Sequence, residues 1–387
     1  MYKKNIWLLG LISLFTDIGS QMVYPLIPQL LQGLGAGATM LGLVEGIAEA
    51  AAALFRGVFG RLSDRLGRQK RFIFLGYGLS NLIRPLFAVA GSVGVVVGLR
   101  FLERMGKALR VPARDAMLAH SAGAGRKGRA FGIHRSMDRI GSLLGPLLAG
   151  IILWASAGNI RLVFLLAVIP GLLSFLFIPW LKEEAAVPAP PAQAHGWSMR
   201  GTDFPRAFWW LMAVNTLFGL ANASNAFLIL KAGTTGLTAP QIPLLWAFYN
   251  AVCALSSPLL GHLSDRWSRR RMLALSFLLF SLLYAGLAAA SESWQIWLLF
   301  GVLGIHYGLS KGIMPAFLSD LIPDSPHLAT AFGLLDMVSA ISVLMASVIM
   351  GLLWDTLGSA TAFGFGAAIS ALALVLFLLR VPPVSQH

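Results

Sequence analysis

Charged side chains interrupt several long apolar runs of this 387-residue chain, and their types and spacing suggest the chemistry that they could do. The run at residues 93–119 carries ionisable groups at intervals of four, three and four residues, which places them on one face of a helix. These groups are Glu103, Lys107, Arg110 and Arg114, with Arg100 and Arg104 beside them. Such a face could attract an anion into a water-filled vestibule.

A neighbouring run at residues 130–154 adds ionisable groups in its first three turns, and they can meet the first set at a similar depth. Together with Arg84 from the run at residues 72–91, these runs supply candidates for contact with an anionic substrate, which are Arg104, Lys107, Arg110, His134 and Arg135. The alternative is structural, because internal ion pairs such as Glu103–Lys107 and Asp138–Arg135 would hold the same helices together.

Proton transfer is the second kind of chemistry, and it needs a carboxylate that burial brings to titrate near neutral pH. Asp17 is the best candidate, because it is the single acid in the run LISLFTDIGSQMVYPL. Further candidates are Glu49, Asp138 and Asp336. Acids such as Glu49 and Asp336 could instead be structural partners of Arg84 or Arg139. A free imidazole titrates near neutrality, which makes His134 and His306 further candidates, although hydrogen-bonded packing is the commoner role for such residues.

The elements that position these residues are membrane-spanning helices. Hydrophobic residues make up 57% of the chain and charged residues 12%, whereas soluble domains carry about 25% charged residues. A span needs about 20 apolar residues, and twelve runs qualify. They are about 5–31, 40–60, 72–91, 93–119, 130–154, 161–181, 206–230, 240–262, 272–290, 294–321, 329–354 and 360–380. Residues 182–205 have the Pro- and Ala-rich composition of a linker, which predicts six-helix bundles at 1–181 and 206–387.

The basic residues predict the orientation. Of 30 Lys and Arg residues, 18 fall in segments that are cytoplasmic if the N-terminus is inside, and two fall on the other side. Both termini are therefore expected in the cytoplasm, so the net charge of +14 gives no reason to expect nucleic acid as a partner. The remaining ten lie within spans, nine of them in the first half, where the spans hold six acids.

The two halves repeat one loop sequence. GRLSDRLGRQKR begins at Gly60, and GHLSDRWSRRRM begins at Gly261, at an offset of 201 residues. The tripeptide AFG recurs at the same offset. Parallel repeats of six helices are a transporter architecture, with the substrate site expected near the midplane between the repeats.

This loop resembles the signature loop of the major facilitator superfamily, and the resemblance covers the whole chain. It implies the major facilitator fold and a gating loop. Its residues here are Gly60, Asp64, Arg65, Gly67 and Arg68, with Asp115 as the implied partner, and Gly261, Asp265, Arg266 and Arg269 in the second copy. Ser268 stands where the family has a glycine. The alternative is that these basic residues only fix topology.

The fifth predicted span carries glycines that resemble the antiporter motif of drug:proton exporters in this superfamily. The residues are Gly132, Gly141, Gly145, Pro146 and Gly150. Small residues let helices approach closely, and proline bends a helix. The resemblance implies a seal against proton leak coupled to export, whereas ordinary close packing is the alternative.

The second half is polar rather than ionic. Its inner spans carry Asn222, Asn225, Tyr249, His306, Tyr307 and Lys311. Amides and aromatic rings suit substrate contact by hydrogen bonding and stacking, although amides also join membrane helices to one another.

We therefore expect a proton-driven exporter of a small, anionic or chelating molecule in the cell membrane, working by alternating access as a monomer. No P-loop, CxxC or HExxH pattern is present, so neither an enzyme nor a metal or cofactor other than the proton is indicated. Three alternatives remain, namely proton-coupled uptake of an organic anion, efflux of a metal ion or chelate, and a membrane receptor or scaffold without transport activity.

Overall fold

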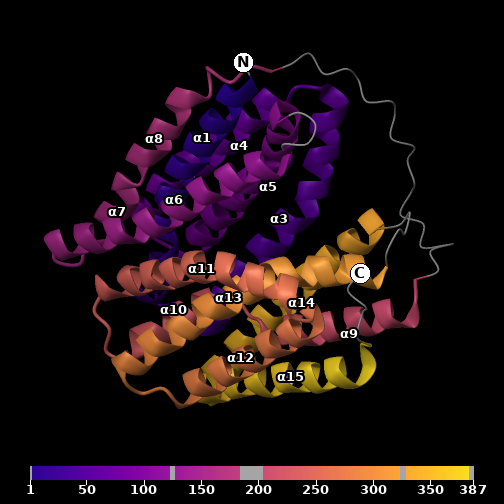
Figure 1. Cartoon of the computed structure of the whole chain (residues 1–387). Helices are drawn as coiled ribbons and strands as arrows, with labels where there is room; N and C mark the ends of the chain where they lie inside the picture. The colour runs from indigo at the N-terminus through magenta and orange to yellow at the C-terminus, as the bar shows by residue number, and fades with distance from the viewer. Residues whose placement is uncertain (1, 123–126, 184–203, 323–327, 383–387) are drawn as a thin grey trace. The chain divides into compact units, whose positions relative to one another are not determined.

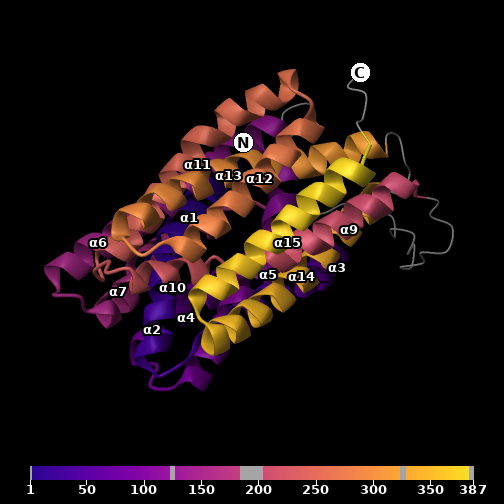
Figure 2. The same cartoon turned by 90° about the horizontal axis from the view of Figure 1, so that it is seen from below.

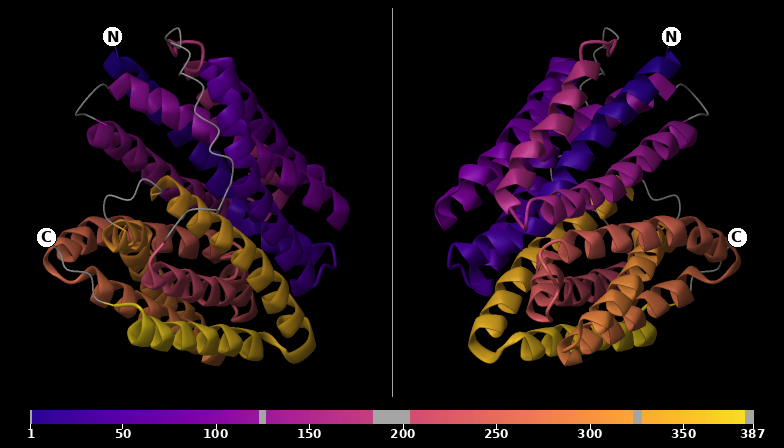
Figure 3. Two further views of the ribbon diagram at one scale, coloured as in Figure 1. Left: turned by 90° about the vertical axis from the view of Figure 1, so that its right-hand side faces the viewer. Right: turned by 90° about the vertical axis from the view of Figure 1, so that its left-hand side faces the viewer.

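The computed structural model describes residues 2–122, 127–183, 204–322 and 328–382, and within these ranges it is helical without a strand (Figures 1 and 3). Side chains of residues 2–3, 261–266, 311–312 and 328–329 lie outside the description. The first-half elements are α1 (Tyr2–Val23), η1 (Tyr24–Leu26), α2 (Ile27–Gly33), α3 (Ala38–Leu66), α4 (Gln69–Ile83), η2 (Arg84–Val89), α5 (Val93–Ala122), α6 (Lys127–Ala155), α7 (Ile160–Leu166) and α8 (Val168–Phe177). The second-half elements are α9 (Arg206–Ala221), α10 (Ala226–Thr234), α11 (Gln241–Arg266), α12 (Arg269–Ala289), α13 (Ser293–Leu321), α14 (Leu328–Leu357) and α15 (Ser359–Arg380).

These helices match the predicted spans in order and position. Within the described ranges, eleven helical segments are long and apolar enough to cross a membrane. The fourth predicted span is also a helix, α5, but its many charges keep it out of that set.

Four of the predicted spans are interrupted. Proline accounts for two of the breaks, because Pro25 and Pro85 lie where α1 and α4 give way to 3-10 turns and their missing N–H cannot continue the helix. A third break separates α7 from α8 at Ala167.

The break between α9 and α10, at residues 222–225, contains no proline or glycine. Side-chain oxygens accept the freed N–H groups there. The Ser224 N–H donates to the Ser347 hydroxyl of α14, and the Ala226 N–H donates to the Ser224 hydroxyl. Such replacement bonds make a broken helix tolerable at membrane depth.

The chain divides into two compact units. Unit 1 comprises Met1–Gly35, Ile47–Gly196 and Thr238–Ala247, and unit 2 comprises Ala36–Gly46, Trp197–Leu237 and Phe248–His387. In unit 1, α1 packs along α6 and α8, while α4 packs along α5. In unit 2, α15 packs along α12 and α9, and α14 packs along α9 (Figure 2).

The two units differ from the predicted halves in two short segments, because residues 36–46 belong to unit 2 and residues 238–247 belong to unit 1. Residues 36–46 bring the start of α3 into unit 2, where the Ala38 and Thr39 N–H groups donate to the Asp355 carboxylate at 2.9 and 2.8 Å. A carboxylate at a helix N-terminus satisfies free N–H groups and complements the helix dipole.

In each repeated loop, one basic residue forms hydrogen bonds with the end of the last helix of the same unit. The Lys70 ammonium donates to the carbonyls of Pro179 and Leu181, just beyond α8, at 2.8 Å each. In the second copy, the Arg270 guanidinium donates to the carbonyls of Leu378 and Val381 at the end of α15. Both contacts place a cation at the carbonyl end of the last helix, which the helix dipole favours.

We expect Lys70→Met to lower the free energy of unfolding by about 0.3–1 kcal/mol, because the carbonyls lose a charged donor. Thermal unfolding of the purified protein measures this change. The matched control is Arg71→Met, because Arg71 is exposed. Equal effects of the two substitutions would contradict the capping role.

Candidate functional site

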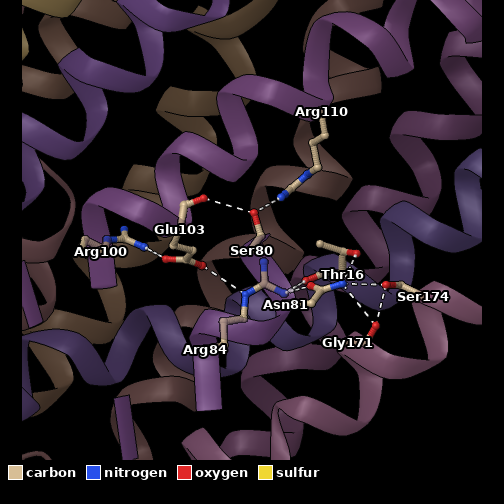
Figure 4. A network of polar contacts seen from close by, with 9 residues as sticks. All are labelled: Thr16, Ser80, Asn81, Arg84, Arg100, Glu103, Arg110, Gly171 and Ser174. Atoms are coloured by element: carbon tan, nitrogen blue, oxygen red, sulfur yellow. Dashed lines mark hydrogen bonds and ion pairs between the residues drawn. The ribbon is translucent and has the colours of Figure 1, made fainter. Parts of the chain in front are cut away.

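A buried ionic network lies within unit 1 (Figure 4). The Glu103 carboxylate of α5 binds Arg84 Nε at 3.1 Å through one oxygen and Arg100 Nη1 at 2.6 Å through the other. All three side chains are at least 94% buried. A charge buried without a partner is strongly destabilising, so Glu103 is needed to compensate the two arginines.

Arg84 is bonded on its other side as well. Its Nη1 donates to the Thr16 carbonyl at 2.9 Å and to Asn81 Oδ1 at 2.7 Å. Asn81 Nδ2 in turn donates to the Ser174 hydroxyl and the Gly171 carbonyl of α8. Figure 4 shows these contacts joining α1, α4, α5 and α8. Arg84 was predicted to contact substrate, but its enclosed position and full set of partners give it a structural role.

The predicted partners of two acids differ from those found. Glu103 contacts Arg84 and Arg100 rather than Lys107, because its side chain points toward α4 and η2. Asp138 contacts His134 at 3.3 Å, whereas Arg135, its predicted partner, is exposed.

Glu49 and Arg104 come together as a pair. Arg104 Nη2 lies 2.5 Å from Glu49 Oε1, which joins α5 to α3 within unit 1. The Glu49 side chain is 42% exposed and that of Arg104 is 12% exposed. A proton on Glu49 would break this pair, so its ion pairing weakens its case as the proton carrier.

Asp17 is different, because its carboxylate forms no hydrogen bond or ion pair with the residues that the structure describes. It lies on α1 and is partly exposed. The charges of Lys107, Arg110 and Arg114 on α5 act on it, as does the negative charge of Asp138 on α6. Unit 1 therefore holds an unpaired carboxylate on which the charges of the basic residues of α5 act.

Asp138 and His134 form a second polar group, one turn apart on α6. Besides His134, the Asp138 carboxylate accepts a hydrogen bond from the Ser13 side chain on α1. His134 Nε2 and Asp138 Oδ1 have no hydrogen-bond partner within the described ranges. No cluster of three or more metal-ligating side chains occurs among the residues that the structure describes.

The glycines predicted for the antiporter motif mostly pack as tight contacts. A Cβ added at Gly141 would lie 2.6 Å from the Leu14 carbonyl oxygen, and one at Gly145 would lie 2.5 Å from that of Ile18. The added atom at Gly141 would also come within 3.0 Å of the Asp17 Cβ. Helices α1 and α6 thus touch through their backbones beside Asp17.

The two ends of that motif behave differently. A Cβ at Gly150 would lie 2.8 Å from the Leu244 side chain, within unit 1, so this position is also closely packed. Gly132 was predicted to share the tight face, but nothing lies within 4 Å of an added Cβ there. Pro146 lies inside the continuous helix α6, whose bounds show no break there.

The first gating loop is mostly open. Asp64, Arg65 and Arg68 are exposed, and they form no ion pair with the residues that the structure describes. Asp115, their predicted partner, instead binds Arg114 at 2.8 Å. An added Cβ at Gly60 would lie 3.3 Å from Pro112, which agrees with the expected close approach. Gly67 has φ +58°, so the turn that ends α3 requires a left-handed residue.

The second gating loop is only partly described. The side chains of Gly261, Asp265 and Arg266 lie outside the described residues, as does that of Lys311. Arg269, at the start of α12, binds Asp320 of α13 at 2.5 Å.

Most of the polar candidates of unit 2 are neighbours. The Tyr307 hydroxyl donates to Asn225 Oδ1 at 3.1 Å, directly beside the break between α9 and α10. The ring of Tyr307 packs edge-on against Tyr249 and His306, with centroids 5.9 and 5.3 Å away. His306 Nδ1 lies 3.1 Å from the Ser276 hydroxyl, so its polar contact is already formed.

The two further candidates of the second half are Asn222 and Asp336. Asn222 follows the last residue of α9 as its C-cap and is partly exposed. Its N–H donates to the Phe218 and Gly219 carbonyls. Asp336 is exposed on α14. Its exposure removes the burial that a proton carrier was expected to have.

Sequence reasoning missed the uncharged members of the network in unit 1. Thr16, Ser80 and Asn81 bind the charged groups or one another, and Tyr77 lies under Arg110. A signal was available, because these polar residues occur in apolar runs opposite an excess of basic residues that need acceptors.

Known proteins match this chain along its length. The sequence model of the Major Facilitator Superfamily matches residues 9–230 and 209–387. An uncharacterized MFS-type transporter of Methanocaldococcus jannaschii is 30% identical, covering 97% of this chain and 94% of its own. The multidrug resistance protein MdtG of Dickeya zeae is 26% identical, covering 84% and 81%.

A crystal structure of the nucleoside transporter NupG superimposes with a TM-score of 0.82 at 12% identity, covering 98% of this chain and 100% of that one. This likeness shows the fold alone. It confirms the predicted all-helical major facilitator architecture.

Proposed function

Since the chain belongs to the major facilitator superfamily and is a membrane transporter rather than an enzyme, we propose that it exports a small molecule from the cytoplasm in exchange for protons. It works by alternating access in the cell membrane, with both termini in the cytoplasm. The unpaired Asp17 carboxylate carries this proposal, because a proton carrier has to bind and release its proton without breaking the fold. The other acids in its surroundings are already bonded to cationic or imidazole side chains.

The packing of α6 supports exchange rather than leak. Gly141 and Gly145 bring the α1 and α6 backbones together beside Asp17. Contact this close between two backbones leaves no gap for a water molecule between the helices at these two positions. Relatives named as multidrug resistance proteins, such as MdtG of Dickeya zeae, support export as the direction.

Membrane vesicles of opposite orientation test the direction. Everted vesicles that hold the full chain are acidified inside by respiration, and a pH-sensitive dye reports the gradient while ethidium, benzoate or benzylammonium is added. An exporter lets protons leave as the compound enters, so we expect a compound-dependent loss of the gradient. The Asp17→Asn protein should show none.

Two other outcomes would decide against export. Proton entry that follows the compound only in right-side-out vesicles would establish uptake. Absence of compound-dependent proton movement in either orientation would contradict proton coupling.

Uptake of an organic anion is the second candidate, and one observation favours it. The charges of three basic side chains of α5 act on Asp17, so an anion bound among them would add negative charge in the surroundings of that carboxylate. Negative charge favours the protonated carboxyl, and by linkage a proton on Asp17 strengthens binding of the anion to the same degree. A proton and a substrate that promote each other's binding are carried together, as in a symporter.

A further inference from the structure

Lys107 and Arg110 are cations in the middle of α5 without a carboxylate within ion-pairing distance among the described residues. Arg110 is 95% buried, and Lys107 is partly buried one turn away. At about 1.5 Å per residue, Arg110 lies about 18 Å and Lys107 about 22 Å along α5 from its end at Ala122. Charges at such depth are costly, and they are retained for pairing, a wet cavity or function.

The acids of unit 1 that could neutralise this pair are occupied elsewhere. Glu103 holds Arg84 and Arg100, and Glu49 holds Arg104. Asp138 contacts His134, and Asp115 contacts Arg114. Asp17 acts on Lys107 and Arg110 through its field without pairing with either.

The surroundings of Arg110 leave donors unused. Its Nη1 donates to the Ser80 hydroxyl at 2.5 Å, and that hydroxyl donates to the Glu103 carbonyl, as Figure 4 shows. The guanidinium lies over the Tyr77 ring, 4.8 Å from its centroid. Arg110 Nε and the Tyr77 hydroxyl are both buried without a hydrogen-bond partner within the described ranges. Buried donors of this kind are normally satisfied.

An oxyanion is the ligand that fits these groups. It would pair directly with two cations that form no ion pair among the described residues, and it would accept from the free guanidinium N–H. Residues three apart on a helix lie on one face, about 5–6 Å apart at Cβ, so one carboxylate, phosphonate or sulfonate group can contact both cations. Guanidinium and ammonium groups bind such oxyanions through charge-assisted hydrogen bonds.

We propose that Lys107 and Arg110 form an anion subsite that holds the oxyanion group of the transported molecule. The proposal rests on the second candidate function argued above, proton-coupled uptake of an organic anion, and names the groups that bind that anion. Asp17 tunes the subsite, since its negative charge opposes the anion until a proton neutralises it. Arg114 adds positive field from the next turn, whereas Asp138 adds negative field from α6.

Binding to the purified full chain in detergent, without any gradient, tests this subsite. The probes are benzoate, phenylphosphonate and benzenesulfonate, with benzylammonium as a cation of matched shape. Concentration-dependent shifts of the unfolding temperature give the apparent affinities. We expect at least one of the anions to raise the unfolding temperature, and benzylammonium to have no effect.

Substitutions then assign the effect to the two residues. Lys107→Gln and Arg110→Gln should each weaken the affinity for the anion about tenfold or more, the size expected for a charge-assisted hydrogen bond. Arg110→Lys keeps the charge and should weaken it less, which covers the case in which Arg110→Gln fails to fold. Asp17→Asn should strengthen the affinity. Arg161→Gln, which removes an exposed positive charge from unit 1, should leave it unchanged.

Several results would overturn the subsite. They are the absence of stabilisation by all three anions, equal stabilisation by benzylammonium, or unchanged affinity in Lys107→Gln and Arg110→Lys. Inorganic sulfate that binds as tightly as benzenesulfonate and is not displaced by it would mark a structural counter-ion instead. Proton-coupled export of ethidium together with any of these results would reject the subsite while leaving the proposed function intact.

Discussion

Asp17→Asn is expected to abolish gradient-driven transport and to leave substrate exchange at zero gradient intact. The asparagine keeps the size of the side chain but cannot carry a proton. Because Asp17 has no ion pair among the described residues, its neutralisation leaves no buried cation newly unpaired, so the fold should survive. Transport into proteoliposomes with and without a pH gradient separates the two activities.

Asp336→Asn is the matched control, because it removes an exposed acid of α14. It should transport like the unmodified protein, and Asp17→Glu should retain part of the driven activity. Full gradient-driven transport by Asp17→Asn, or its loss in Asp336→Asn, would refute the assignment of Asp17 as the proton carrier.

Gly145→Leu is expected to disrupt unit 1 and with it all transport. Even a Cβ at this position would lie 2.5 Å from the Ile18 carbonyl oxygen, which is backbone and cannot turn aside. Helices α1 and α6 would have to separate, and overpacking of this kind commonly costs about 1–3 kcal/mol or more. A lower unfolding temperature and loss of exchange at zero gradient are the measurable results.

Gly132→Leu provides the comparison within the same helix and the same motif. Nothing lies within 4 Å of a Cβ at Gly132, so the larger side chain should be accommodated with an unchanged unfolding temperature. If Gly145→Leu were as stable and active as Gly132→Leu, the close contact between α1 and α6 would be irrelevant to function.

Much of the fold could be predicted because the signals were long and periodic. A membrane helix requires about 20 apolar residues, and each predicted span coincides with helix in the described ranges. Even the heavily charged run at residues 93–119 is a single helix, α5. The repeated loop at Gly60 and Gly261 showed the duplication, because matching positions fall at one offset.

Pairing between helices could not be predicted in the same way. Helical periodicity placed Glu103 and Lys107 on one face, but it did not show that Arg84 of η2 lies closer to Glu103. Likewise, Gly132 and Gly145 look equivalent in sequence, and only the position of α1 distinguishes them. Partner choice depends on the approach of neighbouring helices, which local spacing does not encode.

The interruption between α9 and α10 has a consequence for mechanics. Unlike the proline breaks, every residue from 222 to 225 keeps its N–H, so nothing covalent prevents a continuous helix over 206–234. Exchanging the Ser347 and Ser224 acceptors for backbone carbonyls replaces bonds of similar net worth, about 1 kcal/mol each. Four residues span about 6 Å as helix and up to about 13 Å when extended. Neither a proline nor the number of hydrogen bonds therefore fixes the length of this span, because its four residues can be satisfied as helix or as extended chain at similar cost.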